Sequence, residues 1–296
     1  MRYSSAGSFR RALEDQLKKY HLTSHRPLDR LRKMVAFERL LARLAAHQPD
    51  AWVLKGGFAL QLRIGDKSRT TKDIDLLLRI RPEESHAFLR NAGSLELGDW
   101  FQFEVATPHE DMEGDQKRIL RFPVKALLDG RIFEEFHVDV GFDDPIFEPI
   151  EKLEAPGYLL DFAEIPPAVV PCYPLTQQIA EKVHAYTKPH PSGEPSRVRD
   201  IIDILLIAEL GKINSSYLLQ ALQSTFEAKG THPLPNRLPD PPSSWASPFR
   251  KLARELDLNW GSIDEAKDAA SRFLNPMLHM RVKGIWDPNS WAWKKK

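Results

Sequence analysis

The spacing of apolar residues predicts helices at both ends of the chain. Near the N-terminus, apolar side chains recur at helical spacing over residues 9–20 and 28–46, with Leu31 and Leu44 among them. After Pro171 the same spacing returns, so the second half of the chain is expected to be mainly helical. The helices predicted there span residues 175–186, 200–208, 216–226, 248–256 and 263–274.

The middle of the chain has the shorter apolar runs that are typical of strands. A buried strand is expected over residues 52–54, followed by a helix that starts near residue 58 and a second strand over residues 73–78. A short helix is expected over residues 83–91. Further strands are predicted over residues 100–106, 117–127 and 136–142, and Pro123 indicates an edge position or an irregularity in the second of these.

These elements predict an α+β protein made of three parts. We expect N-terminal helices over residues 1–48 that pack on a core of mixed strands and helices over residues 49–170. A helical lobe is expected over residues 171–296. Residues 187–197 and 229–248 are rich in proline, with serine and glycine, and are predicted to be irregular.

Composition narrows the class of protein without naming its chemistry. The chain has 296 residues, of which 42% are hydrophobic and 28% charged, as in ordinary globular proteins. Its single cysteine, Cys172, excludes an internal disulfide and fits a reducing compartment. No apolar run is long enough to span a membrane and the N-terminus lacks a signal-peptide pattern, so we expect a cytoplasmic protein. The formal net charge of +1 does not by itself indicate nucleic-acid binding.

Asp73 and Asp75 stand two residues apart at the start of a predicted strand. Side chains alternate between the faces of a strand, so both carboxylates are expected on one face. Two adjacent negative charges need a compensating cation, and Mg²⁺, with Mn²⁺ as the alternative ion, binds carboxylates together with substrate phosphates. The pair therefore predicts a metal site, and two solvated surface aspartates are the alternative interpretation.

A glycine pair, Gly56 and Gly57, lies between the predicted strand at residues 52–54 and the helix that follows. Glycine allows a phosphate to approach the backbone closely, and the N-terminus of a helix offers free N–H groups. A tight turn without a ligand is the alternative. A strand, a glycine pair, a helix and then Asp-x-Asp together predict a phosphate cradle near a metal pair, as phosphoryl chemistry requires.

Residues 53–78, VLKGGFALQLRIGDKSRTTKDIDLLL, resemble the nucleotidyltransferase-fold signature in the form seen in the AbiEii/AbiGii toxin family, which is similar to the MenT toxins. Two later motifs match as well: Glu-Lys-Val-His-Ala at 181–185 and Arg-Asp-Ile-Ile-Asp at 199–203. One residue more than in the shortest expected form separates Arg69 from Asp73. The resemblance covers about residues 52–207, and the N-terminal helices and the residues after about 211 carry no motif.

The resemblance implies a nucleotidyltransferase-fold mixed sheet and a set of site residues. The implied catalytic residues are Asp73, Asp75, Asp139, Lys182 and Asp200, with Asp73 and Asp75 as the metal ligands. The implied nucleotide-binding residues are Lys55, Gly56, Gly57, Arg69 and Lys182. Asp139 takes the position of a third carboxylate on a neighbouring strand, where it would act as a general base.

Each of these residues also has a plainer interpretation. Lys182 fits a surface lysine and Asp200 fits a helix cap. Asp203 fits the partner of an arginine, as does Asp139 if it is buried. Arg63 and Arg69 are candidates to neutralise phosphates and fit solvated surface residues equally well.

The resemblance implies that a nucleoside triphosphate donates its nucleoside monophosphate to RNA, in particular to the 3′ end of a tRNA. The protein would be the toxin of a type IV-like toxin–antitoxin pair, with a cognate antitoxin as partner. An aminoglycoside-like small molecule or a protein hydroxyl is an alternative acceptor, and a non-catalytic nucleotide-binding module is a further alternative. An acidic acceptor pocket in the lobe would indicate a small molecule, whereas a basic one would indicate RNA. Basic residues of the irregular segments are candidates to guide RNA phosphates: Lys188, Arg197, Lys229 and Arg237.

Overall fold

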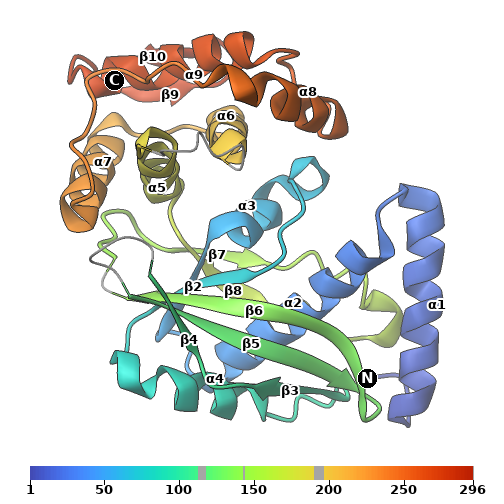
Figure 1. Ribbon diagram of the computed structural model, residues 1–296. Helices are drawn as coiled ribbons and strands as arrows, with labels where there is room; N and C mark the ends of the chain where they lie inside the picture. The colour runs from blue at the N-terminus through green and yellow to red at the C-terminus, as the bar shows by residue number, and fades with distance from the viewer. Residues whose placement is uncertain (113–117, 143, 190–196, 296) are drawn as a thin grey trace.

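Figure 1 shows the computed structural model, which describes residues 1–112, 118–142, 144–189 and 197–295. Two helices come first, α1 (Ala6–Ser24) and α2 (Leu28–His47). The central elements are β1 (Trp52–Lys55), α3 (Gly56–Ile64), β2 (Ile74–Leu78), α4 (Ser85–Gly93), β3 (Phe101–Val105), β4 (His109–Met112), β5 (Arg118–Leu128), β6 (Arg131–Phe142), β7 (Glu151–Glu154) and β8 (Val169–Cys172). The last elements are α5 (Leu175–Thr187), α6 (Val198–Leu210), α7 (Ser215–Lys229), α8 (Ala246–Glu255), α9 (Ile263–Leu278), β9 (Ile285–Asp287) and β10 (Ala292–Lys294).

The central strands form one mixed sheet in the order β3-β5-β6-β2-β1-β8-β7, with β4 paired to β5 next to β3. Strand β2 runs antiparallel to β1 and parallel to β6, and β1 runs parallel to β8. The strand that carries Asp75 therefore lies in the interior of the sheet, where neighbours on both sides fix its register. The sheet confirms the α+β class, and the molecule is a mixed sheet flanked by helices.

The N-terminal helices cover the sheet with an apolar stripe. In α1 the buried side chains are Phe9, Leu13 and Leu17, one helical turn apart, and Ser5 caps the helix by accepting a hydrogen bond from the backbone of Ser8. Helix α2 packs on β6, β8 and α4, and α1 packs on α2. These side chains belong to one core that extends to Cys172 of β8.

A second core lies in the helical lobe, which comprises α5 to α9 and the β9–β10 hairpin at the top of Figure 1. Helix α6 is at its centre, since nearly all of its residues from Val198 to Ala208 are buried. Helix α3 lies between the two cores: its Phe58 packs in the sheet core, and its Leu60 packs in the lobe core. The junction after β1 thus lies where the sheet meets the lobe.

Most predicted elements agree with the structure to within a few residues. Pro123 lies inside β5 at the point where the outer partner changes from β4 to β3, which is the irregularity that the sequence predicted. Strands β4, β7 and β8 were not predicted, because they are short and polar or contain proline. Helix α8 begins at Ala246 rather than at residue 248, and residues 190–196 of one predicted irregular segment lie outside the described residues. Within the described residues, no helix is both long and apolar enough to cross a membrane.

Candidate active site

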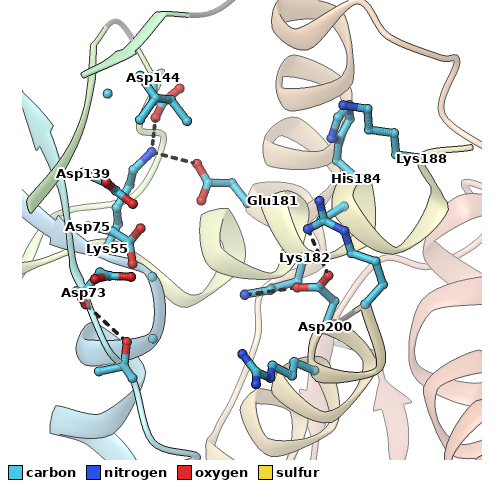
Figure 2. Close-up of a pocket in the computed structure, with 18 of the residues that line it drawn as sticks. Lys55, Asp73, Asp75, Asp139, Asp144, Glu181, Lys182, His184, Lys188 and Asp200 are labelled. Carbon is cyan, nitrogen blue, oxygen red and sulfur yellow. Dashed lines mark hydrogen bonds and ion pairs between the residues drawn. The ribbon is translucent and has the colours of Figure 1, made fainter. Parts of the chain in front are cut away.

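A cleft of about 470 Å³ lies between the sheet and the helical lobe. It has the size of an ordinary small-molecule site. All of the site residues predicted from the sequence line it: Lys55, Gly56, Gly57, Arg69, Asp73, Asp75, Asp139, Lys182 and Asp200. Figure 2 shows the acidic residues of the strands on one side of the cleft and the residues of α5 and α6 on the other.

The sheet wall of the cleft has a row of charges that the strand register aligns. In the register of the sheet, Lys55 of β1 lies opposite Asp75 of β2, and Asp75 lies opposite Asp139 of β6. Asp139 in turn lies opposite Arg121 of β5. The carboxylates of Asp75 and Asp139 therefore lie side by side in the interior of the sheet. Lys55 flanks the first on β1 and Arg121 flanks the second on β5. Partners in register project to the same face, so the row gathers acidic oxygens where a bound cation would be favoured.

The ionised form of Asp75 is disfavoured by its surroundings. Its burial and the neighbouring charge of Asp139 raise the pKa of Asp75 to about 6, against the opposing effects of Lys55 and Lys182. Gly56, which has a φ of +67°, makes room for this carboxylate. A Cβ at Gly56 would lie 1.9 Å from Oδ2 of Asp75, so the first glycine of the pair is required by Asp75 whether or not phosphate binds.

Asp73 lies just before β2 and, like Asp75, projects into the cleft (Figure 2). One of its carboxylate oxygens lies 3.3 Å from Nδ1 of His137. His137 of β6 thus forms a hydrogen bond to Asp73. The backbone carbonyl of Asp73 accepts a hydrogen bond from the Thr71 hydroxyl, which fixes the end of the loop before β2.

Asp139 lies beside Asp75, but an arginine holds both of its oxygens. Nε of Arg121 donates to Oδ1 at 2.8 Å and a terminal nitrogen donates to Oδ2 at 2.7 Å. This forked pair agrees with the plainer interpretation of Asp139. Each oxygen keeps a further lone pair, so the pairing leaves Asp139 able to accept a proton from an acceptor hydroxyl.

On the lobe side, two aspartates of α6 hold the cations that the motifs singled out. Nζ of Lys182 lies 3.1 Å from Asp200 and 3.0 Å from Asp203. Arg69 also donates to both oxygens of Asp203, from Nε at 3.0 Å and 3.2 Å and from a terminal nitrogen at 3.0 Å. The Asp203 side chain is fully buried, and Lys182 and Arg69 lower its pKa despite the opposing effect of its burial. Asp203 therefore joins the loop before β2 to the lobe.

The rest of the lobe wall is basic. Among the described residues of the lobe that line the cleft, five are basic and two are acidic, Glu181 and Asp200. The basic residues are Lys182, Lys188, Arg197, Arg199 and Lys229. Three of the four residues predicted to guide RNA are in this set, whereas Arg237 does not line the cleft. Arg63 also lies elsewhere, where it donates to Glu151 and to the carbonyl of Tyr173.

The structure adds residues to the site that the sequence did not single out. Arg121 and Asp144 line the cleft, as do His184 and Thr231, and Nε2 of His184 lies 2.8 Å from the Thr231 hydroxyl. Burial, together with the nearby positive charge of Lys229, lowers the pKa of His184 to about 3, so this ring is neutral at ordinary pH. His184 lies within the motif at residues 181–185 but was given no role, and no motif marks the other three, because their partners are distant in sequence.

Comparison with family models gives a match to the nucleotidyl transferase AbiEii toxin family of type IV toxin–antitoxin systems, over residues 39–281. The chain belongs to this family. It is therefore a nucleotidyltransferase of the toxin type, and the match extends beyond the motif-bearing residues 52–207 on both sides. A comparison with curated proteins found no match.

Two solved structures are similar to this AbiEii family member, and the first of them supports the fold. The chain is similar to MenT4, a nucleotidyltransferase toxin from Mycobacterium tuberculosis H37Rv, with a TM-score of 0.54 and 18% identity over 90% of this chain and 98% of MenT4. It is also similar to a proposed nucleotidyltransferase from H. pylori, with a TM-score of 0.45 and 18% identity over 84% of this chain and 93% of the other. At these identities the likeness to MenT4 concerns the fold.

Proposed function

We propose that this nucleotidyltransferase transfers a nucleoside monophosphate from a nucleoside triphosphate to RNA, with the 3′ end of a tRNA as the acceptor, in a reaction that depends on a divalent ion. The proposal rests mainly on the opposite charges of the two walls of the cleft. The sheet wall is acidic around Asp73 and Asp75, and the lobe wall is basic. A metal-bound triphosphate fits the first wall and a polyanionic acceptor fits the second.

The residues fit a divalent ion at Asp73 and Asp75. Asp75 is a buried carboxylate whose pKa is raised to about 6, so a cation beside it would relieve an existing charge imbalance. Within the described part of the chain, no three His, Cys, Asp or Glu side chains are arranged to hold a metal. Phosphate oxygens of the substrate would therefore complete the shell of Mg²⁺ or Mn²⁺. Such an ion neutralises charge on the phosphates and orients them for in-line displacement.

The protein's own contribution is mainly positioning. Gly56 and Gly57, at the start of α3, line the cleft, and their backbone N–H groups would contact phosphate oxygens. Lys182 would add a point charge from the lobe side, where Asp200 and Asp203 hold its ammonium in place. Arg69 and Arg197 share these two carboxylates, so the cations of this cluster outnumber its anions and leave positive charge for a phosphate. An acceptor hydroxyl would attack the α-phosphorus and pyrophosphate would leave, so the reaction needs no covalent enzyme intermediate.

The basic lobe wall favours RNA over the alternative acceptors. A cationic aminoglycoside would be repelled by Lys188, Arg197, Arg199 and Lys229, whereas RNA phosphates would be attracted. We further propose that the protein acts in the cytoplasm, where triphosphates and tRNA are available, and that a cognate antitoxin opposes it, in line with its family.

Transfer of label from α-³²P nucleoside triphosphates tests the proposal. Each of the four triphosphates is incubated in turn with the protein, Mg²⁺ and bulk tRNA, and Asp75→Asn is the inactive control. We expect label on tRNA from one or more triphosphates, which is lost in the variant and on removal of Mg²⁺. Tight binding of triphosphate without label on RNA would refute the RNA acceptor and direct the search to small molecules and proteins.

A further inference from the structure

The ammonium of Lys55 is enclosed by two carboxylates that come from different parts of the chain. Its Nζ lies 2.8 Å from Oδ2 of Asp144, in the segment after β6, and 3.4 Å from Oε1 of Glu181 on α5. Figure 2 shows both acidic side chains pointing toward this nitrogen. The Lys55 side chain is 16% exposed, so the three groups form a nearly closed ionic cluster at the sheet side of the cleft.

The backbone of β6 leaves room for this cluster. A Cβ at Gly141 would lie 3.2 Å from Nζ of Lys55 and 3.7 Å from Oδ2 of Asp144, so a larger residue there would press on the ion pair. Burial alone would lower the pKa of Lys55, but Glu181 and Asp144 raise it above its usual range. The lysine is therefore a permanent positive charge that is already neutralised by its own carboxylates.

This arrangement does not suit a phosphate ligand. A phosphate that reached Nζ of Lys55 would bring its own negative charge next to Asp144 and Glu181, and like charges at this range repel. The geometry suits a cation instead, because two carboxylate oxygens converge on one point and carboxylates are the protein groups that divalent ions bind. The ammonium fills the place that such an ion would take.

We propose that Lys55 is a positioning residue whose ammonium acts as a built-in cation between Asp144 and Glu181, in place of a second divalent ion. It joins β1 to the lobe and leaves Asp73 and Asp75 to hold a single metal ion. The part of this inference that concerns Asp73 and Asp75 rests on the proposed function. The part that concerns Lys55 does not, since it predicts how the free protein binds metal.

Metal counting in the nucleotide-free protein tests the inference. Mn²⁺ is titrated into the full chain and the free ion is measured by electron paramagnetic resonance. We expect the wild type to bind no more than one Mn²⁺ per chain, and Lys55→Met to bind one more than the wild type. Lys55→Met combined with Glu181→Gln should lose the added ion, because one of its two carboxylates is gone.

Lys188→Met is the matched control for the loss of one charge from the cleft. Lys188 lines the same cleft, and within the described residues its ammonium has no carboxylate partner, so this variant should bind as many ions as the wild type. Equal metal binding by Lys55→Met and the wild type would overturn the inference. An added ion in Lys55→Met together with no ion in the wild type would support the role of Lys55 and count against the metal site at Asp73 and Asp75.

A second measurement uses the folded wild type and does not depend on the stability of Lys55→Met. Reductive methylation, read by peptide mass spectrometry, should modify Lys55 more slowly than Lys188, and Glu181→Gln should make Lys55 react faster. Addition of a nucleoside triphosphate should leave the rate at Lys55 unchanged. Protection of Lys55 by the nucleotide would show that it contacts the phosphates and would overturn the inference.

Discussion

Replacement of Gly56 by alanine should disable the site while leaving the protein folded. The added methyl carbon would lie 1.9 Å from Oδ2 and 2.5 Å from Cγ of Asp75. Ordinary contacts begin near 3.4 Å, so the carboxylate must move by about 1.5 Å, which is the difference between 3.4 and 1.9 Å. A misplacement of about 1 Å costs on the order of 100-fold in rate, so we expect at least that loss of transfer.

Gly130→Ala is the control that has the backbone strain of Gly56→Ala without its clash with Asp75. Gly130, in the turn between β5 and β6, has a φ of +66°, against +67° at Gly56, and a Cβ there would meet no atom within 4 Å. Both variants should lose about 1–2 kcal/mol from the left-handed backbone. In a chain of this size that loss lowers the melting temperature by roughly 2–4 °C per kcal/mol.

The assay is label transfer from α-³²P nucleoside triphosphate, run beside thermal unfolding of both variants. Gly130→Ala should keep nearly the wild-type rate, and Gly56→Ala should lose it at a similar melting temperature. If Gly56→Ala transfers label within about threefold of Gly130→Ala, Asp75 can move aside at no cost to catalysis. The reasoning that places this carboxylate at the centre of the site would then be wrong.

Three further substitutions test separate parts of the electrostatic description. Asp203→Asn should lower the free energy of unfolding in urea by about 3–5 kcal/mol, because Lys182 and Arg69 lose their buried carboxylate. Asp240→Asn removes the exposed partner of Lys267 and should change that free energy little. Equal small losses in the two variants would contradict the role given to burial. The folded state holds the pKa of His184 at about 3, below the unfolded value of 6.5, so it binds fewer protons and stability should fall as pH drops below 6.5. The loss should reach about 2 kcal/mol at pH 5 and be absent from His184→Gln, and parallel pH profiles for the two proteins would refute it. Asp75→Asn should abolish transfer in the presence of Mg²⁺. In metal-free protein at pH 7.5 the same variant should raise the free energy of unfolding by up to about 3 kcal/mol, since it removes a carboxylate whose pKa is raised to about 6. A lower melting temperature would contradict this.

The sequence predicted the elements best where the apolar pattern continued over many residues. Helices α2, α5 and α9 have apolar faces over several turns, which few other conformations can bury, so their positions follow from the pattern. Strands β7 and β8 have four residues each and β8 contains Pro171, so neither is long enough to show an alternating apolar pattern. They exist because β1 offers a free edge to β8, and β8 then offers one to β7.

Local sequence by itself determined the residue types of the site. Strand alternation predicts Asp73 and Asp75 on one face, and both project into the cleft although β2 begins only at Ile74. A glycine pair before a helix exposes backbone N–H groups in any tertiary context. The motifs therefore specify a phosphate cradle and an acidic pair through geometry that spans only a few bonds, and all of the residues predicted from them line one cleft.

Only the tertiary structure decided how these charges are partnered. Arg121 reaches Asp139 through the register of β5 and β6, and Asp203 reaches Arg69 across 134 positions of sequence. Lys55 reaches Asp144 in the segment after β6 and Glu181 on α5 of the lobe, which are 89 and 126 positions away along the chain. Electrostatic interaction depends on distance and burial rather than on separation along the chain, so the same lysine can bind a phosphate or fill a carboxylate cluster. The fold alone determines which of the two it does.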